Sequence, residues 1–195
     1  MSSPYQSTTA IPITSTDVVS PAGPDTGIEI RHLQRGDVEL MGRLLEGLSA
    51  RDRYLRFLAP APRFPARTLR VLADADGTRH VVLAAFRGDR AIGEGRFNRP
   101  TAESDTADLA VSVVSDQQQR GVGRALIAAL AVEADRRKIR RFTFDVSPEN
   151  RVVLSMLKRW DARLLLADRL VSGDVLVAAI LAAERAGFTS GARAA

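Results

Sequence analysis

Two glycines at the start of a predicted helix place the strongest restriction on this chain. Residues 107–114 (ADLAVSVV) are almost continuously apolar, which predicts a central strand covered on both faces. From Val122 onward the apolar residues recur at helical spacing. Gly121 and Gly123 stand where this helix begins, although glycine weakens helices. Because glycine has no Cβ, the backbone at this turn is open to close approach by a ligand.

The start of this helix is a predicted anion site. The first N–H groups of a helix have no partner within it, and they carry a partial positive charge. Arg120 and Arg124 add fixed positive charge beside the two glycines. The dinucleotide fingerprint needs another glycine where Leu126 stands, and the P-loop needs a lysine that is absent here. The turn therefore predicts a phosphate ligand outside these two common nucleotide motifs.

The pattern along the chain predicts one α/β domain over residues 28–182. Residues 1–27 are rich in Ser, Thr and Pro and predict a disordered tail, and residues 183–195 are taken as a C-terminal tail. Between them the expected order is strand, helices, three strands, helix, strand, helix and two strands. Hairpin signals imply antiparallel neighbours, and two helical crossovers imply parallel ones. The expected fold is a mixed, mostly antiparallel sheet of about six to seven strands flanked by helices.

Local signals mark several ends of these elements. Asp37 and Ser49 are predicted to be the N-caps of the first two helices, which follow the strand predicted over residues 28–33. Gly88 and Asp89 predict the turn of a hairpin. The last two strands are expected to meet around residues 172–174 (Ser-Gly-Asp).

Composition excludes several classes of protein. The chain has no cysteine and only two distant histidines, so no metal site is expected. It has no apolar run of about 20 residues and no basic segment followed by an apolar one at its start, which favours the cytoplasm. The net charge is +5, and nearly all of the positive charge is arginine. Arginine richness with few lysines suggests a bacterium of high GC content. The arginines are expected either to form a solvated surface or to contact a phosphate-bearing cofactor or a nucleic acid.

The segment from Gln118 to Gly123 (QQRGVG) reads as Q-x-x-G-x-G between a strand and a helix. It resembles the acetyl-CoA pyrophosphate loop of the GCN5-related N-acetyltransferases, the GNAT family. The order of elements agrees with that fold over most of the chain. The segments LSARDRYLRFLAP and ADLAVSVV are most similar to the catalytic domain of bacterial Pat-type protein-lysine acetyltransferases. In such proteins this domain is often joined to a cyclic-nucleotide-binding or acyl-CoA-synthetase-like domain.

The resemblance implies a set of cofactor-binding residues. The loop residues implied to bind the pyrophosphate are Gln118, Gln119, Arg120, Gly121, Val122, Gly123 and Arg124. The strand residues implied to pair with the pantetheine arm are Val111, Ser112 and Val113. Asn150 matches an asparagine of the family that contacts the cofactor, and it is equally a good helix-cap residue.

The resemblance also implies the catalytic groups. Asp108 is the expected general base, which would take a proton from the acceptor ammonium. The alternative is that Asp108 is only a solvent-exposed residue at the start of the strand. Glu94 on the preceding strand is a second candidate carboxylate. Leu157 stands where many members of the family carry a tyrosine as general acid, which the Pat-type proteins also lack. The arginines of residues 51–56 are expected either to line the acceptor cleft or to form a solvated helix face.

The sequence therefore favours a cytoplasmic bacterial N-acetyltransferase that uses acetyl-CoA as donor. Its acceptor is expected to be an amine, either a protein lysine or a small molecule, and the chain a monomer or a homodimer without membrane contact. Two alternatives stay open. One is an acyl-CoA-binding sensor or scaffold without turnover. The other, ranked last, is a nucleic-acid-binding protein, which rests only on the arginines and the isoelectric point of about 10.5.

Overall fold

The computed structural model describes residues 27–60 and 63–191. The strands are β1 (Glu29–His32), β2 (His80–Arg87), β3 (Arg90–Asn98), β4 (Thr106–Val113), β5 (Arg141–Val146), β6 (Arg163–Ala167) and β7 (Leu170–Leu176). The helices are α1 (Val38–Glu46), α2 (Ala50–Phe57), α3 (Ala66–Leu72), α4 (Val122–Arg136), α5 (Arg151–Arg159) and α6 (Val177–Gly191), with a 3-10 turn η1 (Ser115–Gln117). Within these ranges no helix is long and apolar enough to cross a bilayer.

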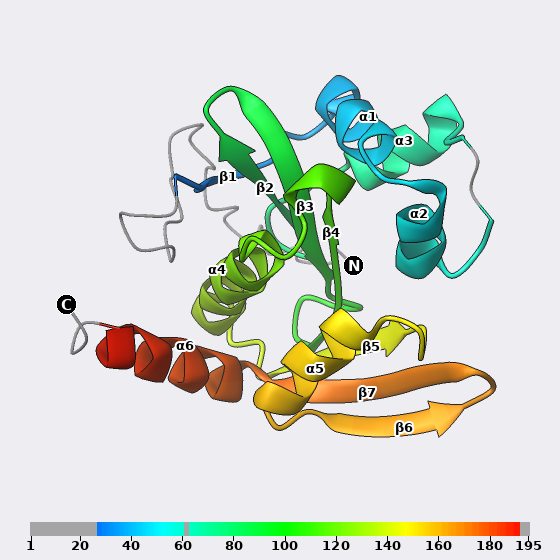
Figure 1. Ribbon diagram of the computed structural model, residues 1–195. Coiled ribbons are helices and arrows are strands. Elements are labelled where there is room, and N and C mark those ends of the chain that lie inside the picture. Colours follow the sequence, from blue (N-terminus) through cyan, green and yellow to red (C-terminus); the bar gives the residue numbers. More distant parts are fainter. Residues whose placement is uncertain (1–26, 61–62, 192–195) are drawn as a thin grey trace, which may run out of the picture.

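The strands form one mixed sheet in the order β1-β2-β3-β4-β5-β7-β6. The β4–β5 pair is parallel, and the other five neighbouring pairs are antiparallel. The predicted mixed, mostly antiparallel sheet is therefore confirmed. Strong twist turns the β5–β7 part across the β1–β4 part, as Figure 1 shows.

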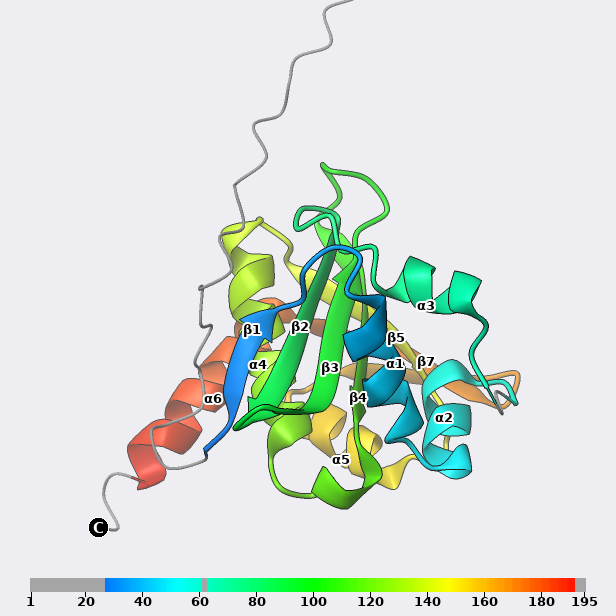
Figure 2. The same cartoon turned by 90° about the horizontal axis from the view of Figure 1, so that it is seen from above.

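Helices cover both faces of the first part of the sheet. Helix α4 packs on β3, where side-chain-free positions at Gly93 and Gly95 admit Leu126 and Leu130 close to the strand. Helices α1, α2 and α3 cover the opposite face, as the view from above makes clear (Figure 2). Helix α6 packs beside α4. The core thus lies on both faces of β2–β4, and the central strand β4 is held from both sides.

The predicted caps and the first hairpin are confirmed. Asp37 accepts a hydrogen bond from the N–H of Leu40 at the start of α1, and Ser49 accepts one from Asp52 at the start of α2. Gly88 and Asp89 form the two-residue connection between β2 and β3. These local signals worked because a capping side chain and its N–H partner lie within three residues of each other.

The predicted position and extent of the last two strands were wrong. The last turn lies at Asp168 and Arg169, both in the left-handed region, so residues 172–174 are inside β7. Residues 177–181, which were read as the end of the last strand, begin α6, and this helix extends to Gly191 and into the expected C-terminal tail. Alanine-rich sequence favours a helix here. The expected disordered tail, residues 1–27, lies outside the described residues except for Gly27.

Gly173 lies in β7 because β6 passes too close for a side chain. A Cβ at this position would overlap the carbonyl oxygen of Arg163 and lie 3.0 Å from Cε2 of Phe144. We expect Gly173→Ala to lower the free energy of unfolding by about 1–3 kcal/mol, because the two strands must separate. Urea denaturation measures this change.

The matched control is Gly42→Ala in α1, where the added methyl group would meet only Cδ1 of Leu69 at 3.8 Å. This change should stabilise the protein by about 0.5–1 kcal/mol, because alanine is the better helix former. Equal free energies of unfolding for Gly173→Ala and the unchanged protein would contradict the close approach of β6.

Candidate functional site

A fork between the two parallel strands defines the centre of the candidate site. Strands β4 and β5 pair only at three positions, which end at Asp108 opposite Thr143. Both strands are fully described, and β4 continues to Val113 and β5 to Val146 without further pairing to each other. The predicted residues Val111, Ser112 and Val113 lie half-buried on this unpaired part of β4. The main chain of β4 beyond Asp108 thus has no strand partner on the β5 side, and it can bond an extended ligand except where the carbonyl oxygen of Val113 accepts from Gln118.

The glycine turn lies at the open end of this fork. Gly121, with φ 81°, is the N-cap of α4, and Gln119 also has a positive φ of 59°. No described side chain caps α4, so the N–H groups of its first turn, Val122, Gly123 and Arg124, lack a partner within the helix. Nothing lies within 4 Å of a Cβ added at Gly121, and only Cγ2 of Val113, at 3.7 Å, at Gly123. The turn thus presents unpartnered donors and open space, which suits a phosphate group.

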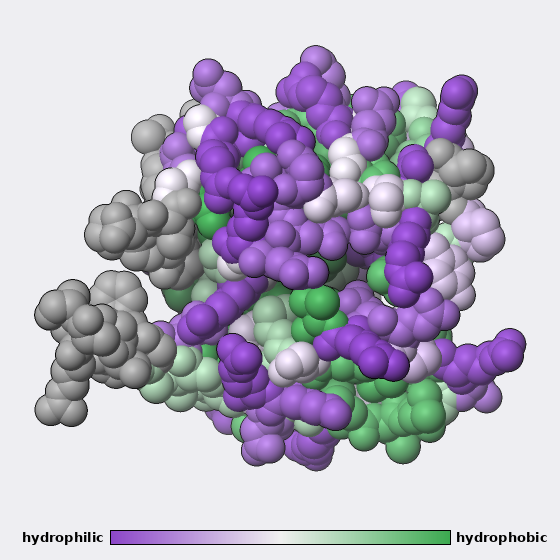
Figure 3. All heavy atoms as spheres, in the orientation of Figure 1, coloured by the Kyte–Doolittle hydropathy of each residue, from purple (hydrophilic) through white to green (hydrophobic). Residues whose placement is uncertain are grey.

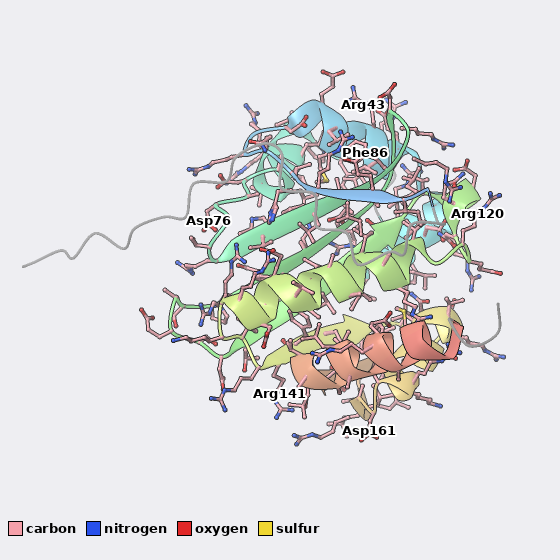
Figure 4. The ribbon with its side chains drawn as sticks, turned by 90° about the vertical axis from the view of Figure 1, so that its left-hand side faces the viewer. Arg43, Asp76, Phe86, Arg120, Arg141 and Asp161 are labelled. Atoms are coloured by element: carbon pink, nitrogen blue, oxygen red, sulfur yellow. The ribbon has the colours of Figure 1, made fainter. Side chains whose placement is uncertain are left out.

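The side chains of the loop have different surroundings. Gln118 donates a hydrogen bond from Nε2 to the carbonyl oxygen of Val113, which ties the loop to the end of β4. Val122 is buried, so a ligand could meet only its backbone. Arg120 is exposed at the N-terminal end of α4 (Figure 4). Arg124 forms an ion pair of 2.9 Å with Glu184 of α6, a contact that a phosphate would have to compete with.

Asp108 lies at the branch of the fork with its side chain exposed. The surrounding protein removes part of the water around the carboxylate, and this partial burial raises its pKa. The negative charge of Asp145 on β5 raises the pKa further, whereas Arg56 on α2 lowers it, and the net shift is upward. A carboxylate that is accessible and more basic than usual fits the predicted role of proton acceptor.

Glu94 is the weaker candidate for that role. Its side chain is only 1% exposed and receives hydrogen bonds from Ser112 at 2.8 Å and from Nε of Arg96 at 2.9 Å. Burial alone would raise its pKa, but the charges of Arg96 and Arg56, with the bond from Ser112, leave it below the usual value. Glu94 is therefore a buried counter-ion for two arginines, and a substrate cannot readily transfer a proton to it.

Asn150 and Leu157 have structural roles in α5. Asn150 is its N-cap and accepts a hydrogen bond of 3.3 Å from the N–H of Val153. This confirms the cap interpretation, and contact of Asn150 with a cofactor stays a prediction. Leu157 is buried in the core, so no proton donor stands at this position.

Arg56 has a definite place in the structure, although the sequence left its role open. Its side chain is 14% exposed and lies with its Nη2 3.4 Å from Oε1 of Glu94. The interpretation of residues 51–56 as a wholly solvated helix face is wrong for this residue. The helical spacing did not reveal it, because its partner Glu94 lies 38 residues away.

A second missed feature joins α2 to the beginning of the glycine loop. The Ser115 hydroxyl donates to Oδ2 of Asp52 at 2.5 Å and accepts from the N–H of Ser49 at 2.8 Å. Partial burial would raise the pKa of Asp52, but the bonds from Ser115 and Ser49 outweigh it and lower the pKa. Ser115 begins η1, just after β4 ends at Val113, so this contact holds the segment that follows β4 against the start of α2. A separation of 63 residues hid the pair from sequence analysis.

A splayed pair of parallel strands with an uncapped helix beside it defines a class of protein that binds a long ligand with a phosphate at one end. The comparison with known families agrees with this description. Residues 48–161 match the family model described as the acetyltransferase (GNAT) family. This chain belongs to the GNAT family of acetyltransferases.

Individual relatives support the same assignment. Over 139 residues the chain is 32% identical to Acetyltransferase Pat of Mycolicibacterium smegmatis (strain ATCC 700084 / mc(2)155), covering 68% of this chain and 40% of that protein. The chain thus spans less than half of that relative. The GNAT domain of S. lividans PAT is similar with a TM-score of 0.72 and 28% identity, over 76% of this chain and 90% of that domain.

A more distant structure shares the fold alone. The spermidine N-acetyltransferase of Vibrio cholerae, solved in complex with CoA and spermine, aligns with a TM-score of 0.63 at 13% identity. The match covers 80% of this chain and 99% of that one.

Proposed function

We propose that this chain transfers an acetyl group from acetyl-CoA to the side-chain amine of a protein lysine, in the cytoplasm of a bacterium. The observation that carries the proposal is the fork between β4 and β5, with Asp108 at its branch and the uncapped start of α4 at its open end. This arrangement supports a phosphate-binding role for the turn and a proton-accepting role for Asp108, at opposite ends of the unpaired part of β4.

The residues present fit acetyl-CoA, which would supply the acetyl group as a thioester. The N–H groups of Val122, Gly123 and Arg124 would hold its pyrophosphate at the start of α4. The unpaired main chain of Val111, Ser112 and Val113 would bond the amides of its pantetheine arm. A main-chain N–H of the same strand would polarise the thioester carbonyl, as in an oxyanion hole.

Asp108 would receive the proton that the acceptor must lose. An amine attacks only as the free base, so the ammonium first gives a proton to the carboxylate, directly or through water. The C–N bond then forms as the C–S bond breaks, the nitrogen gives up its second proton to water, and the leaving thiolate takes a proton from solvent. The raised pKa of Asp108 makes this carboxylate a better proton acceptor than an ordinary aspartate.

The open sheet face beside Asp108 supports a polypeptide acceptor. Asp145 on β5 and Leu165 on β6 are exposed there, and both project from the same face as Asp108. An extended surface of this kind suits a lysine that is presented on another protein better than it suits a small amine, which usually binds in an enclosed pocket. The similarity of LSARDRYLRFLAP to Pat-type proteins points the same way.

The test is a thiol-release assay of the purified chain with acetyl-CoA and separate acceptors. The acceptors are a folded protein rich in surface lysines, the same protein with its lysines methylated, and spermidine. Release with the first acceptor alone supports the proposal, and mass spectrometry should show acetyl-lysine. Release with spermidine alone makes the acceptor a polyamine. Binding of acetyl-CoA without release in any arm would favour the sensor alternative and contradict the enzyme.

A further inference from the structure

Two arginines and one glutamate are largely buried together on the face of the sheet that α2 covers. The side chain of Glu94 is 1% exposed, that of Arg96 8% and that of Arg56 14%. Glu94 on β3 lies opposite Ser112 of β4, so it shares a face of the sheet with Ser112 and Asp108. Two guanidiniums and one carboxylate leave this group with one positive charge in excess. Because an uncompensated buried charge is costly, the excess indicates that a further anion comes to this place when the protein works.

Arg96 and Arg56 are held very differently by their surroundings. Arg96 donates from Nε to Oε2 of Glu94 at 2.9 Å, and from Nη1 to the carbonyl oxygen of Leu72 at 2.8 Å. Among the described residues, Arg56 makes one hydrogen bond, from Nη2 to Oε1 of Glu94 at 3.4 Å, and its buried Nε has no partner. Its guanidinium also lies 4.9 Å from the ring centre of Phe57. Arg96 is therefore the structural partner of Glu94, and Arg56 retains hydrogen-bonding capacity for another group.

Arg56 lies toward Asp108 and away from the glycine turn. Asp52, one helical turn earlier in α2, is bonded to Ser115 just before the glycine loop. Burial lowers the pKa of Arg56, whereas the charges of Glu94 and Asp108 raise it, so Asp108 is near enough to act on this guanidinium. The excess positive charge therefore lies beside the proposed proton acceptor and not at the proposed phosphate site.

Asp108 has charges of opposite sign on its two sides. Asp145 on β5 adds negative charge on one side, and Arg56 adds positive charge on the other, where α2 packs on β4. Figure 3 shows a largely hydrophilic surface near α2, in contrast to the apolar patch on the lower part of the molecule, where β6 and β7 lie. An acceptor with its ammonium toward the two aspartates and a carboxylate toward Arg56 would match this pattern of charge.

We propose that Arg56 binds an acidic side chain close to the acceptor lysine, so that this chain selects lysines with an acidic neighbour. The inference rests on the proposed function, the transfer of acetyl to a protein lysine. In an extended acceptor, side chains two positions apart project to the same side, about 7 Å from each other. An aspartate or glutamate two positions from the lysine therefore faces the same surface as the lysine. Its hydrogen bond with a guanidinium is charge-assisted, and such bonds are roughly twice as strong as neutral ones.

The first test is the rate of thiol release with two peptides, at a pH where Asp108 is ionised. Each peptide has one lysine. One peptide carries glutamate two positions before and two positions after the lysine, and the other carries glutamine at both places. We expect kcat/KM to favour the glutamate peptide by about 10-fold or more, through KM, as a hydrogen bond to a charged group supplies. In Arg56→Gln the two peptides should react with nearly equal kcat/KM.

Arg51→Gln is the matched control on the same helix. Arg51 is 69% exposed and its charge is paired with Glu149 at 3.4 Å, so this variant should keep the preference. Arg56→Gln should fold, because Glu94 keeps Arg96 as its partner. Its midpoint of urea denaturation should be no lower than that of the unchanged protein. A lower midpoint together with an unchanged preference would make Arg56 a structural residue and overturn the proposal.

A binding measurement without transfer separates this inference from the enzymatic activity. Fluorescence anisotropy uses the same two peptides, labelled and already acetylated on the lysine. The glutamate peptide should bind more tightly, and Arg56→Gln should remove the difference. Equal transfer to both peptides would overturn the inference and leave the acetyltransferase standing, whereas a binding preference that depends on Arg56 without thiol release would do the reverse. Absence of a binding preference would also overturn the inference. So would a loss of affinity for acetyl-CoA in Arg56→Gln, because the anion would then belong to the donor.

Discussion

Replacing Gly123 with glutamate should abolish the binding of acetyl-CoA to this chain. The new carboxylate would lie in the first turn of α4, among the N–H groups that we propose hold the pyrophosphate. It would occupy the space that the phosphate needs and repel its charge. We expect the affinity to fall at least about 100-fold, or ~2.7 kcal/mol, as measured by isothermal titration calorimetry.

The fold should tolerate this change, because a Cβ at Gly123 makes only an ordinary contact with Cγ2 of Val113, at 3.7 Å. A glutamate near a helix N-terminus is also favourable for the helix itself. Gly123→Gln is the matched control of similar size without charge, and it should lose less affinity than the glutamate variant. Unchanged binding in both variants would show that the donor does not occupy this turn.

The glycine turn could be predicted because its signal is local. The strand, the glutamines, the two glycines and the helix follow each other directly along the chain, and each acts on its own backbone. The same holds for the caps at Asp37 and Ser49, whose partners are three residues away. The fork itself was expected only from the resemblance to the family, since sequence patterns do not report where two paired strands separate.

The features that were missed depend on contacts between distant segments. Arg56 belongs to a helix with no buried residue, and only the fold shows that its guanidinium reaches Glu94. The contact of Ser115 with Asp52 is hidden in the same way. Gly173 was taken for a turn residue because glycine is common in turns, whereas here it permits the close approach of β6. The sequence shows that such residues are present, but it does not show which of them contact each other in the fold.

Replacing Asp108 with asparagine should slow acetyl transfer by about 10²–10⁴-fold, the usual contribution of a general base. Asparagine keeps the size of the side chain but cannot accept the proton of the ammonium. Because Asp108 lies at the branch of the fork and not at the glycine turn, the affinity for acetyl-CoA should be unchanged. The measurement is the rate of thiol release with saturating acceptor, alongside calorimetric titration of the donor.

The dependence on pH follows from the upward shift of the pKa of Asp108. The carboxylate acts as a base only when ionised, so the rate should fall as the pH is lowered through its pKa. Because the pKa is raised by partial burial and by Asp145, this fall should begin at a higher pH than for an ordinary aspartate. Arg56→Gln removes the charge that opposes the shift, and it should move the acid limb of the profile to higher pH still.

Glu94→Gln distinguishes Asp108 from Glu94, the second candidate for the general base. Glu94 is buried between Arg56 and Arg96, so loss of its charge leaves two arginines without their counter-ion. This should lower the free energy of unfolding by about 3–5 kcal/mol, the cost of breaking a buried ion pair. The folded fraction of Glu94→Gln should nevertheless retain an acid limb in its pH profile. If Glu94→Gln instead keeps its stability and loses that limb, Glu94 is the base and the assignment of Asp108 is wrong.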